Sequence, residues 1–294
     1  MISKSSAWLL ATRPKTLPAS IGPVLLGTSL ASFEQIKTTL PIIILILINA
    51  VTLQIGTNLV NDYFDSVRGL DDHNRIGPDR ALQMGWLTKE ELKRGIIFVF
   101  TLAFVFGCFL MYIGGLPIVI IGLMSLLMAF MYTGGPLPLS YFGLGEVLAF
   151  IFFGPIPVWG TYFLITKDYD YFPAIVGCIP GLISLALMGI NNLRDHLNDK
   201  EKGKKTLTTI FGTNFGRGLI LFGAFFPNLL SVIFFLKFEN YYFLTPILAF
   251  LAFSKIWLYV LKGKINSELN NSLAATGKFL FLTCLLNAIG FFSL

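Results

Sequence analysis

The stretch LPIIILILINAVTLQIGTNLVNDYFD, residues 40–65, decides the fold class of this 294-residue chain. It has no charged side chain before Asp62, and it exceeds the roughly 18 apolar residues that a helix needs to cross a bilayer. A helix over these residues is about 37 Å long, which is more than the roughly 30 Å of the hydrocarbon core. We therefore expect a transmembrane helix whose polar end, with Asp62 and Asp65, lies near the membrane boundary.

The composition extends this interpretation to the whole chain. Hydrophobic residues make up 55% of the sequence and charged residues only 13%, against about 25% charged residues in an ordinary soluble domain. These values exclude a water-soluble globular protein, and the long uncharged runs indicate an all-α polytopic membrane protein. We expect a single transmembrane domain over residues 1–294, with about nine helices around a central cavity. The expected helices cover residues 17–33, 40–65, 95–113, 117–132, 145–166, 172–195, 218–236, 242–261 and 273–294.

Basic residues are concentrated in alternate connecting segments. The N-terminal segment and the polar loops at about residues 66–94 and 196–217 are rich in Lys and Arg, whereas the intervening connections have few. By the positive-inside rule, the N-terminus and both polar loops are expected to be cytoplasmic. An odd number of spans then places Leu294 outside the inner or plasma membrane. The net charge of +6 comes from these segments, which lack an aromatic-rich basic face, so we expect membrane lipids and no nucleic acid as partners.

The chain also repeats itself weakly. Asn61 and Asp65 recur 130 positions later as Asn191 and Asp195, and the Gly-Pro pair at residues 22–23 recurs at residues 154–155. Repeat-built membrane proteins often place their site where the two repeats meet. We therefore expect two pseudo-repeated helical halves that share one site.

The first acidic cluster stands at the end of the span over residues 40–65. On a helix, Asn58, Asp62 and Asp65 share one face, and Asn61 lies one turn before Asp65. Two further acidic residues, Asp71 and Asp72, follow in the polar loop, and Arg75 and Arg80 come after them. This order places carboxylates and cations at one end of the helix.

The second cluster has the same pattern. Asn191, Asp195 and Asp199 form one stripe on a helix, and Lys204 and Lys205 follow. Both stripes are expected on the cytoplasmic side, so they project from two helix ends toward the same side of the membrane.

Two stripes of like charge need a cationic partner. Like charges one turn apart weaken a helix, and an ionised carboxylate in the bilayer costs roughly 2.5 to 3.5 kcal/mol, so stability does not explain these residues. Magnesium prefers hard oxygen ligands and leaves positions for the phosphates of a substrate. The basic residues that follow each cluster suit the same phosphates. The sequence therefore predicts a magnesium diphosphate site near the membrane boundary, the depth at which a lipid with a polar head would be held.

The two motifs, NDYFDSVRGLDDHNRIGPDRALQMG (residues 61–85) and NNLRDHLNDKEKGKKTL (residues 191–207), resemble those of the UbiA-type intramembrane aromatic prenyltransferases. The segments RPKTLPASIGPVLLG (residues 13–27) and YTGGPLPLSYFGLGE (residues 132–146) are similar to the branch that prenylates 1,4-dihydroxy-2-naphthoate in menaquinone synthesis. The resemblance covers most of the chain up to about residue 212. Where the wider family has a third acidic residue in the first motif, this chain has Gly69, and Asp71 or Asp72 is expected to substitute.

The resemblance implies an Mg²⁺-dependent transfer of a prenyl group from a polyprenyl diphosphate to 1,4-dihydroxy-2-naphthoate, with loss of carbon dioxide, to give demethylmenaquinol. The expected metal ligands are Asp62, Asp65, Asp71, Asp195 and Asp199. The expected diphosphate-binding residues are Asn58, Asn61, Arg80, Asn191, Lys204 and Lys205. The side chains expected to shield the allylic cation from water are Tyr63, Phe64 and Tyr132.

Other interpretations stay open. Within the same enzyme class, the acceptor could be 4-hydroxybenzoate, homogentisate or haem. A secondary transporter also combines repeats with intramembrane acids, although its site usually lies near the bilayer midplane, where these spans are almost wholly apolar. A CDP-alcohol phosphotransferase is membrane-bound and Asp-rich, but we expect its acids in one tight motif rather than in two separated ones.

Overall fold

The computed structural model describes residues 2–70 and 76–294, and every element in these ranges is helical. The helices before the middle of the chain are α1 (Lys4–Ala11), η1 (Pro14–Thr16), α2 (Pro18–Thr28), α3 (Phe33–Val67), α4 (Lys89–Gly114), α5 (Leu116–Met131), η2 (Leu139–Tyr141), α6 (Gly145–Phe152) and α7 (Pro155–Thr166). Those after it are α8 (Phe172–Val176), α9 (Cys178–Glu201), α10 (Leu207–Phe211), α11 (Thr213–Phe238), η3 (Tyr241–Leu244), α12 (Thr245–Ala252), α13 (Ser254–Lys262) and α14 (Leu269–Phe292). The expected all-α class is confirmed.

Helix α3 contains the whole apolar run and first acidic cluster of residues 40–65. A capping box between Ser32 and Gln35 starts it, and it continues for 35 residues, or about 52 Å. The same unbroken helix therefore carries the apolar run and, in its last two turns, Asp62 and Asp65. Helix α9 likewise carries both an apolar run and the second motif, because it continues through Asp195 and Asp199 to its end at Glu201.

Three of the expected spans are divided in the structure, and the one over residues 172–195 is divided only at Gly177, between α8 and α9. Residues 145–166 form α6 and α7, which are separated at Phe153 and Gly154. Pro155 begins α7 and has no N–H to continue the ladder of α6. Gly154 is required there, since an added Cβ would lie 2.5 Å from the Phe150 carbonyl oxygen and 2.6 Å from that of Gly177. Residues 241–262 likewise form two helical segments bent by 50°.

Each of the nine expected spans is helical over most of its length, but their number as membrane spans is not confirmed. Among the described residues, six helices or helix pairs are long and apolar enough to cross a membrane by themselves, and the bent segment at residues 241–262 makes up to seven. Helix α5 has 16 residues and α2 has 11. These two are short for a crossing on their own.

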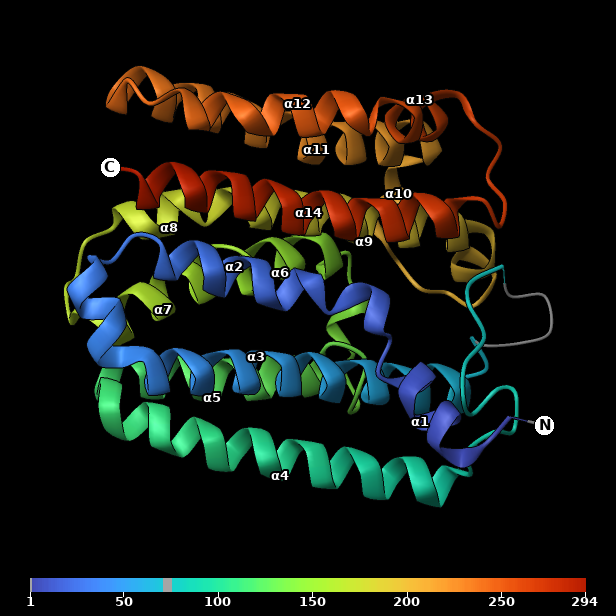
Figure 1. Ribbon diagram of the computed structural model, residues 1–294. Helices are drawn as coiled ribbons and strands as arrows, with labels where there is room; N and C mark the ends of the chain where they lie inside the picture. The colour runs from blue at the N-terminus through green and yellow to red at the C-terminus, as the bar shows by residue number, and fades with distance from the viewer. Residues whose placement is uncertain (1, 71–75) are drawn as a thin grey trace.

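The helices lie roughly parallel to one another in stacked layers (Figure 1). Helices α12 and α11 form one side, α14 and α9 follow, then α2 and α6, then α3 and α5, and α4 covers the opposite side. The N-terminus and the C-terminus lie at opposite ends of this bundle, and α3 and α9 both end near the N-terminus (Figure 1). The two acidic motifs therefore share one end of the molecule.

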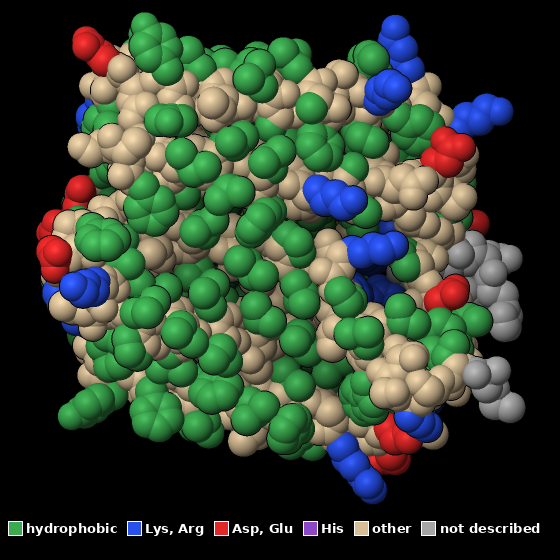
Figure 2. Space-filling view, viewed as in Figure 1, with side chains coloured by type: hydrophobic (Ala, Val, Ile, Leu, Met, Phe, Trp, Pro, Cys, Tyr) green, Lys and Arg blue, Asp and Glu red, His purple; other side chains and the backbone are tan. Residues whose placement is uncertain are grey.

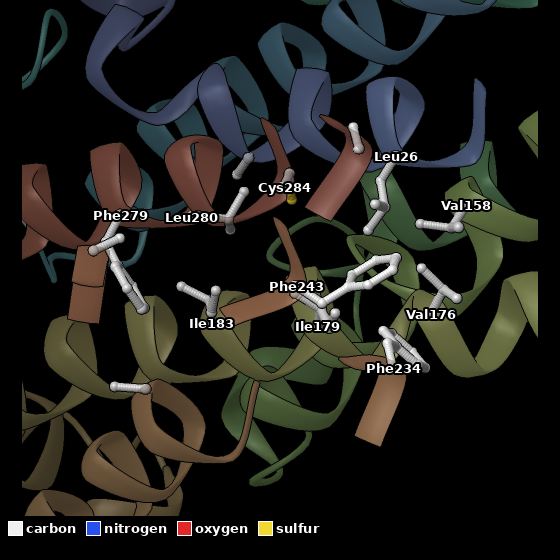
Figure 3. Packing of buried hydrophobic residues seen from close by; sticks show 14 of the residues in the cluster. Leu26, Val158, Val176, Ile179, Ile183, Phe234, Phe243, Phe279, Leu280 and Cys284 are labelled. Atoms are coloured by element: carbon white, nitrogen blue, oxygen red, sulfur yellow. The ribbon is translucent and has the colours of Figure 1, made fainter. Parts of the chain in front are cut away.

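The largest hydrophobic core joins α2 and α9 to the C-terminal helices. It includes Leu26, Ile179, Ile183, Phe243 and Phe279, none of which is exposed, and Figure 3 shows them packed between the helices. This core fixes α9, the helix of the second motif, relative to α2. Glycine allows α2 and α7 to pack closely as well, since an added Cβ at Gly27 would lie 2.6 Å from the Val158 carbonyl oxygen.

The surface agrees with a protein embedded in a membrane. Figure 2 shows hydrophobic side chains over the length of the helices, whereas charged side chains gather mostly at the two ends. Many large apolar side chains are exposed, among them Phe98, Phe109, Tyr112 and Leu248. Such an extended apolar surface is unfavourable in water but suits lipid. The chain is an integral membrane protein.

Candidate active site

A cavity of about 780 Å³ opens between the helices that carry the two acidic motifs and extends among α2, α4, α5, α6 and α7. Ten of the expected site residues line it: Asn58, Asn61, Asp62, Asp65, Arg80, Tyr132, Asn191, Asp195, Asp199 and Lys204. The structure therefore brings the two motifs to one site. Away from them the lining is mainly apolar, with Leu53, Leu110, Ile121, Met128 and Phe152 among its residues.

The two motifs are also joined directly. Asn198 Nδ2, on α9, donates a hydrogen bond of 2.8 Å to the carbonyl oxygen of Leu70, which follows α3. A second connection runs through α14, because Asn270 accepts from Arg194 Nη1 at 2.8 Å and donates to the carbonyl oxygen of Ile76 at 3.1 Å. The ends of α3, α9 and α14 are thus held around the polar end of the cavity.

Each of three carboxylates in the cavity has a basic partner. Arg80 Nη2 lies 3.7 Å from Asp65 Oδ2, and Lys204 Nζ lies 3.4 Å from Asp199 Oδ1. Arg194 binds Asp195 with two hydrogen bonds, from Nε to Oδ1 at 2.7 Å and from Nη2 to Oδ2 at 2.6 Å. These acids and bases largely compensate one another in a site that is shielded from water.

Asp62 has different surroundings from the other acids. It is 2% exposed, and its two oxygens accept from the backbone N–H groups of Ala81, at 3.0 Å, and of Leu82, at 3.4 Å. These bonds hold the turn that directly follows Arg80. These bonds indicate that Asp62 anchors this turn, and its expected role as a metal ligand stays a prediction.

The asparagines of the first motif are also engaged. Asn58 Nδ2 donates to the carbonyl oxygen of Thr12 at 2.9 Å, and Asn61 Oδ1 accepts from the hydroxyl of Thr133 at 2.5 Å. Arg68, one turn beyond Asp65, donates to the carbonyl oxygens of Thr133 and Gly135. The segment after α5 is therefore fixed against α3 beside the motif.

Three expected site residues do not line the cavity. Lys205 is exposed, its backbone pairs with Phe142, and its N–H donates to the Tyr141 carbonyl oxygen. Successive side chains of an extended segment point to opposite sides, so Lys204 faces the cavity and Lys205 faces away. Tyr63 and Phe64 pack instead in a hydrophobic cluster between α3 and its neighbours. Asp71, and Arg75 with it, lie outside the described residues.

Further polar residues, beyond those expected from the two motifs, belong to the site. Arg13, Lys15, Asn192, Arg194 and Asn270 all line the cavity. Arg13 has a positive φ of 53°, an unfavourable backbone conformation for a residue other than glycine, and such strain often occurs at functional sites. The position of Arg194 next to Asp195 was visible in the sequence, but its 3% exposure and its paired hydrogen bonds were not.

The charges in the cavity act on one another. Burial acts to lower the pKa of Lys204, but the negative charges of Asp199 and Asp65 raise it above its ordinary value, so Lys204 is a cation at neutral pH. Lys204 Nζ also lies 5.9 Å from the centre of the Tyr141 ring. Burial, together with the charge of Asp65, raises the pKa of Tyr141 to about 12. The polar end of the cavity thus keeps a permanent positive charge beside its carboxylates.

The donor set suits a hard divalent cation, although no ready-made cage is present. Among residues 2–70 and 76–294, no three His, Cys, Asp or Glu side chains converge closely enough to hold a metal ion. However, Asp199 Oδ2 is buried and accepts no hydrogen bond from the described residues. Magnesium commonly binds one or two carboxylates and takes its other ligands from water and phosphate. The carboxylates of the cavity could supply the protein ligands of such a magnesium ion.

Comparison with known proteins identifies the family. The model of the UbiA prenyltransferase family matches residues 20–285. The chain belongs to the UbiA prenyltransferase family. The resemblance inferred from the two motifs is therefore confirmed, and the match extends over the C-terminal helices, which the motifs did not cover.

Individual relatives of known sequence or structure belong to the same family. The 1,4-dihydroxy-2-naphthoate octaprenyltransferase of Escherichia coli (strain K12) is 38% identical over 219 residues, which are 72% of this chain and 70% of that protein. The Homo sapiens UbiA prenyltransferase domain-containing protein 1 is 30% identical over 229 residues, 77% of this chain and 67% of that protein. A solved UbiA homologue from Archaeoglobus fulgidus, bound to DMAPP and Mg²⁺, has the same fold, with a TM-score of 0.63, 15% identity and coverage of 98% of this chain and 99% of that one.

Proposed function

We propose that this protein transfers a polyprenyl group from a polyprenyl diphosphate to 1,4-dihydroxy-2-naphthoate, with loss of the ring carboxylate as carbon dioxide, and so forms demethylmenaquinol. One observation carries the proposal: Asp65, Asp195 and Asp199 line one cavity whose remaining walls are mainly apolar. A prenyl diphosphate has the matching shape, with a charged head and a long hydrocarbon tail. Curated relatives that are 32 to 38% identical are 1,4-dihydroxy-2-naphthoate octaprenyltransferases, which favours this acceptor over 4-hydroxybenzoate or homogentisate.

Magnesium would be held by one or two of the cavity carboxylates Asp65, Asp195 and Asp199, and there it would neutralise negative charge on the diphosphate. The buried Asp199 Oδ2, which accepts no hydrogen bond from the described residues, supports this assignment. A solved UbiA homologue bound to GPP and Mg²⁺ supports it as well.

The basic side chains would bind the diphosphate. Arg80 and Lys204 now pair with Asp65 and Asp199 at 3.7 and 3.4 Å, distances longer than a strong charge-assisted hydrogen bond. Both side chains can therefore turn to phosphate oxygens when these carboxylates bind a metal ion. Asn58, Asn61 and Asn191 line the same cavity and supply further hydrogen-bonding groups.

The reaction is an electrophilic aromatic substitution. Departure of diphosphate leaves an allylic cation, the ring carbon that bears the carboxylate attacks it, and carbon dioxide leaves from that carbon. Water must be kept out until the ring attacks. Tyr132, which lines the cavity, is positioned to shield the cation, whereas Tyr63 and Phe64 are packed elsewhere. The apolar walls of α3, α4 and α5 would take the prenyl tail.

The membrane arrangement is part of the proposal. We infer nine crossings, in which α2 and α5 count as short spans and each broken pair counts as one, arranged as two pseudo-repeated halves. The opposite positions of the termini support an odd number of crossings. The Lys and Arg residues at the end that carries the motifs favour a cytoplasmic N-terminus and active site in the inner or plasma membrane.

A product assay tests the function. Purified protein is incubated with a polyprenyl diphosphate, Mg²⁺ and, in separate reactions, 1,4-dihydroxy-2-naphthoate, 4-hydroxybenzoate and homogentisate. We expect a prenylated naphthoquinol whose mass shows loss of carbon dioxide. Prenylation of another acceptor in preference to the naphthoate would contradict the acceptor, and the absence of any prenylated product would contradict the reaction.

A further inference from the structure

Glu146 is a buried carboxyl group that has no part in the reaction described above. It lies in the first turn of α6 with 0% of its surface exposed, and it does not line the cavity. Its Oε1 accepts a hydrogen bond of 2.8 Å from Asn192 Nδ2. A buried carboxyl group is costly unless it is well bonded, and Oε2 has no hydrogen-bond partner among the described residues. Its presence is therefore not explained by stability.

The bond to Glu146 fixes the orientation of an amide that does line the cavity. Asn192 is 5% exposed and belongs to the cavity wall. An asparagine amide has donors on its nitrogen and an acceptor on its oxygen. Glu146 accepts from one of the two N–H groups of Nδ2 and so fixes the plane of the amide, and no hydrogen bond to Oδ1 forms within the described part of the chain. Asn192 thus offers a hydrogen-bond acceptor to the cavity.

Asn192 lies deeper along α9 than the acids of the second motif. Asn192 lies three residues before Asp195 on α9, so its Cα is about 4.5 Å further from the cytoplasmic end of the helix. Met188 is one turn deeper, and the hydroxyl of Tyr132 donates to its sulfur at 3.0 Å. Ala149 of α6 also lines the cavity. One hydrogen-bond acceptor therefore lies in a wall made of an aromatic ring, a thioether and a methyl group.

Gly145 allows α6 to approach this wall closely. An added Cβ at Gly145 would lie 3.1 Å from the hydroxyl oxygen of Tyr132, 3.8 Å from Met188 Cγ and 3.9 Å from Asn192 Nδ2. The residue before Glu146 is thus small at the point where α6 meets all three side chains. The start of α6 and the wall of the cavity form one packed unit.

This wall does not match a diphosphate. Phosphate oxygens without protons only accept hydrogen bonds, so an acceptor facing them would be unsatisfied and repelled. A hydroxylated aromatic ring has both an apolar face and hydroxyl donors. We propose that Glu146 orients Asn192 so that Asn192 Oδ1 accepts a hydrogen bond from a hydroxyl group of the aromatic acceptor. Asn192 is then a specificity-determining residue and Glu146 a positioning residue, and this inference rests on the proposed function.

The test measures the effect of each variant on the KM of the two substrates separately. KM is measured for 1,4-dihydroxy-2-naphthoate and for the prenyl diphosphate in wild type, Asn192→Leu, Glu146→Leu and Glu146→Gln. Loss of one neutral hydrogen bond predicts a KM for the naphthoate that is about 5- to 10-fold higher in both leucine variants, with an unchanged KM for the diphosphate. Glu146→Gln keeps an oxygen that can accept from Asn192 Nδ2, so it is expected to restore most of the affinity lost in Glu146→Leu.

Acceptor analogues give a second measurement. Inhibition constants are compared for 1-hydroxy-2-naphthoate and 4-hydroxy-2-naphthoate, each of which lacks one hydroxyl group. In wild type, the analogue without the recognised hydroxyl is expected to bind about 5- to 10-fold more weakly than the other, and Asn192→Leu is expected to abolish this difference. If a leucine variant does not fold, Asn192→Ala and the wild-type comparison of analogues replace it.

Several outcomes would overturn the inference. They are an equal rise in KM for both substrates, a raised Mg²⁺ requirement with an unchanged KM for the naphthoate, and a Glu146→Gln variant as impaired as Glu146→Leu. Each would show that Asn192 serves the packing or the metal end instead. An active wild type with unaffected variants refutes this inference alone, whereas a wild type that does not prenylate the naphthoate refutes the proposed function.

Discussion

Asn198 Nδ2 donates a hydrogen bond of 2.8 Å to the carbonyl oxygen of Leu70, which joins residues that are 128 positions apart in the sequence. Asn198 precedes Asp199 of the second motif, and Leu70 follows the helix that carries Asp65 of the first. Because of this bond and the shared cavity, the two motifs can act on a single headgroup.

The acidic pair is predicted to be essential. Asp65→Asn and Asp195→Asn should each lower prenyl transfer by at least about 100-fold, because each removes a charge that stabilises the departing diphosphate through its cation. Product formation is measured by mass spectrometry, and folding is checked by thermal melting in detergent. Asp168→Asn, an exposed carboxylate outside the cavity, is the matched control and should retain activity. Retention of most activity in both site variants would remove the argument for a metal-bound diphosphate.

Activity is predicted to depend on a divalent cation. Chelation should abolish product formation, and added Mg²⁺ should restore it, because the carboxylates and the diphosphate cannot share the cavity without a neutralising ion. The measurement is initial rate against free Mg²⁺ concentration. A transferase that works equally well in excess chelator would contradict the prediction.

Asp62 is predicted to matter for stability in a way that Asp65 does not. Asp62→Ala leaves the N–H groups of Ala81 and Leu82 without their acceptor, so the free energy of unfolding should fall by about 1 to 3 kcal/mol for each buried group that stays unsatisfied. The KM for the prenyl diphosphate should also rise, because the released turn directly follows Arg80. Thermal melting of Asp62→Ala beside Asp65→Asn measures the difference. Equal stability of the Asp62 variant and wild type would argue that these bonds do not hold the turn.

The termini are predicted to lie on opposite sides of the membrane. Single cysteines are placed at Ile2 and at Leu294 in a chain without the native Cys108, Cys178 and Cys284. A membrane-impermeant thiol reagent should then label Ile2→Cys only from the cytoplasmic side and Leu294→Cys only from the other. Labelling of both positions from one side would require an even number of crossings and would contradict the nine-span arrangement.

Much of the site was predictable because its residues follow helical periodicity. Asp65, Asp195 and Asp199 lie on continuous helices, so their spacing in the sequence already placed them on common faces. The same periodicity explains why Tyr63 and Phe64 do not line the cavity. They lie about 100° and 200° around α3 from Asp62, on faces that pack against other helices.

Other features depend on contacts between distant segments. The choice between Lys204 and Lys205 was not visible in two adjacent lysines, because it follows from the pairing of residue 205 with Phe142. The same holds for Asp62, whose partners lie 19 and 20 residues away in a turn without regular periodicity. The bond between Glu146 and Asn192 joins α6 to α9 and has no signature in either segment alone.

The sequence by itself determined the membrane class, the helices and the two sets of carboxylates, because apolar run length and helical spacing are local properties of the chain. Only the tertiary structure decided which acid anchors a turn and which acids share a cavity. It also decided which lysine faces that cavity and which asparagine presents its oxygen to it. Those outcomes depend on where a few hydrogen bonds form between helices that the packed core brings together, and such bonds leave no periodic pattern in the sequence.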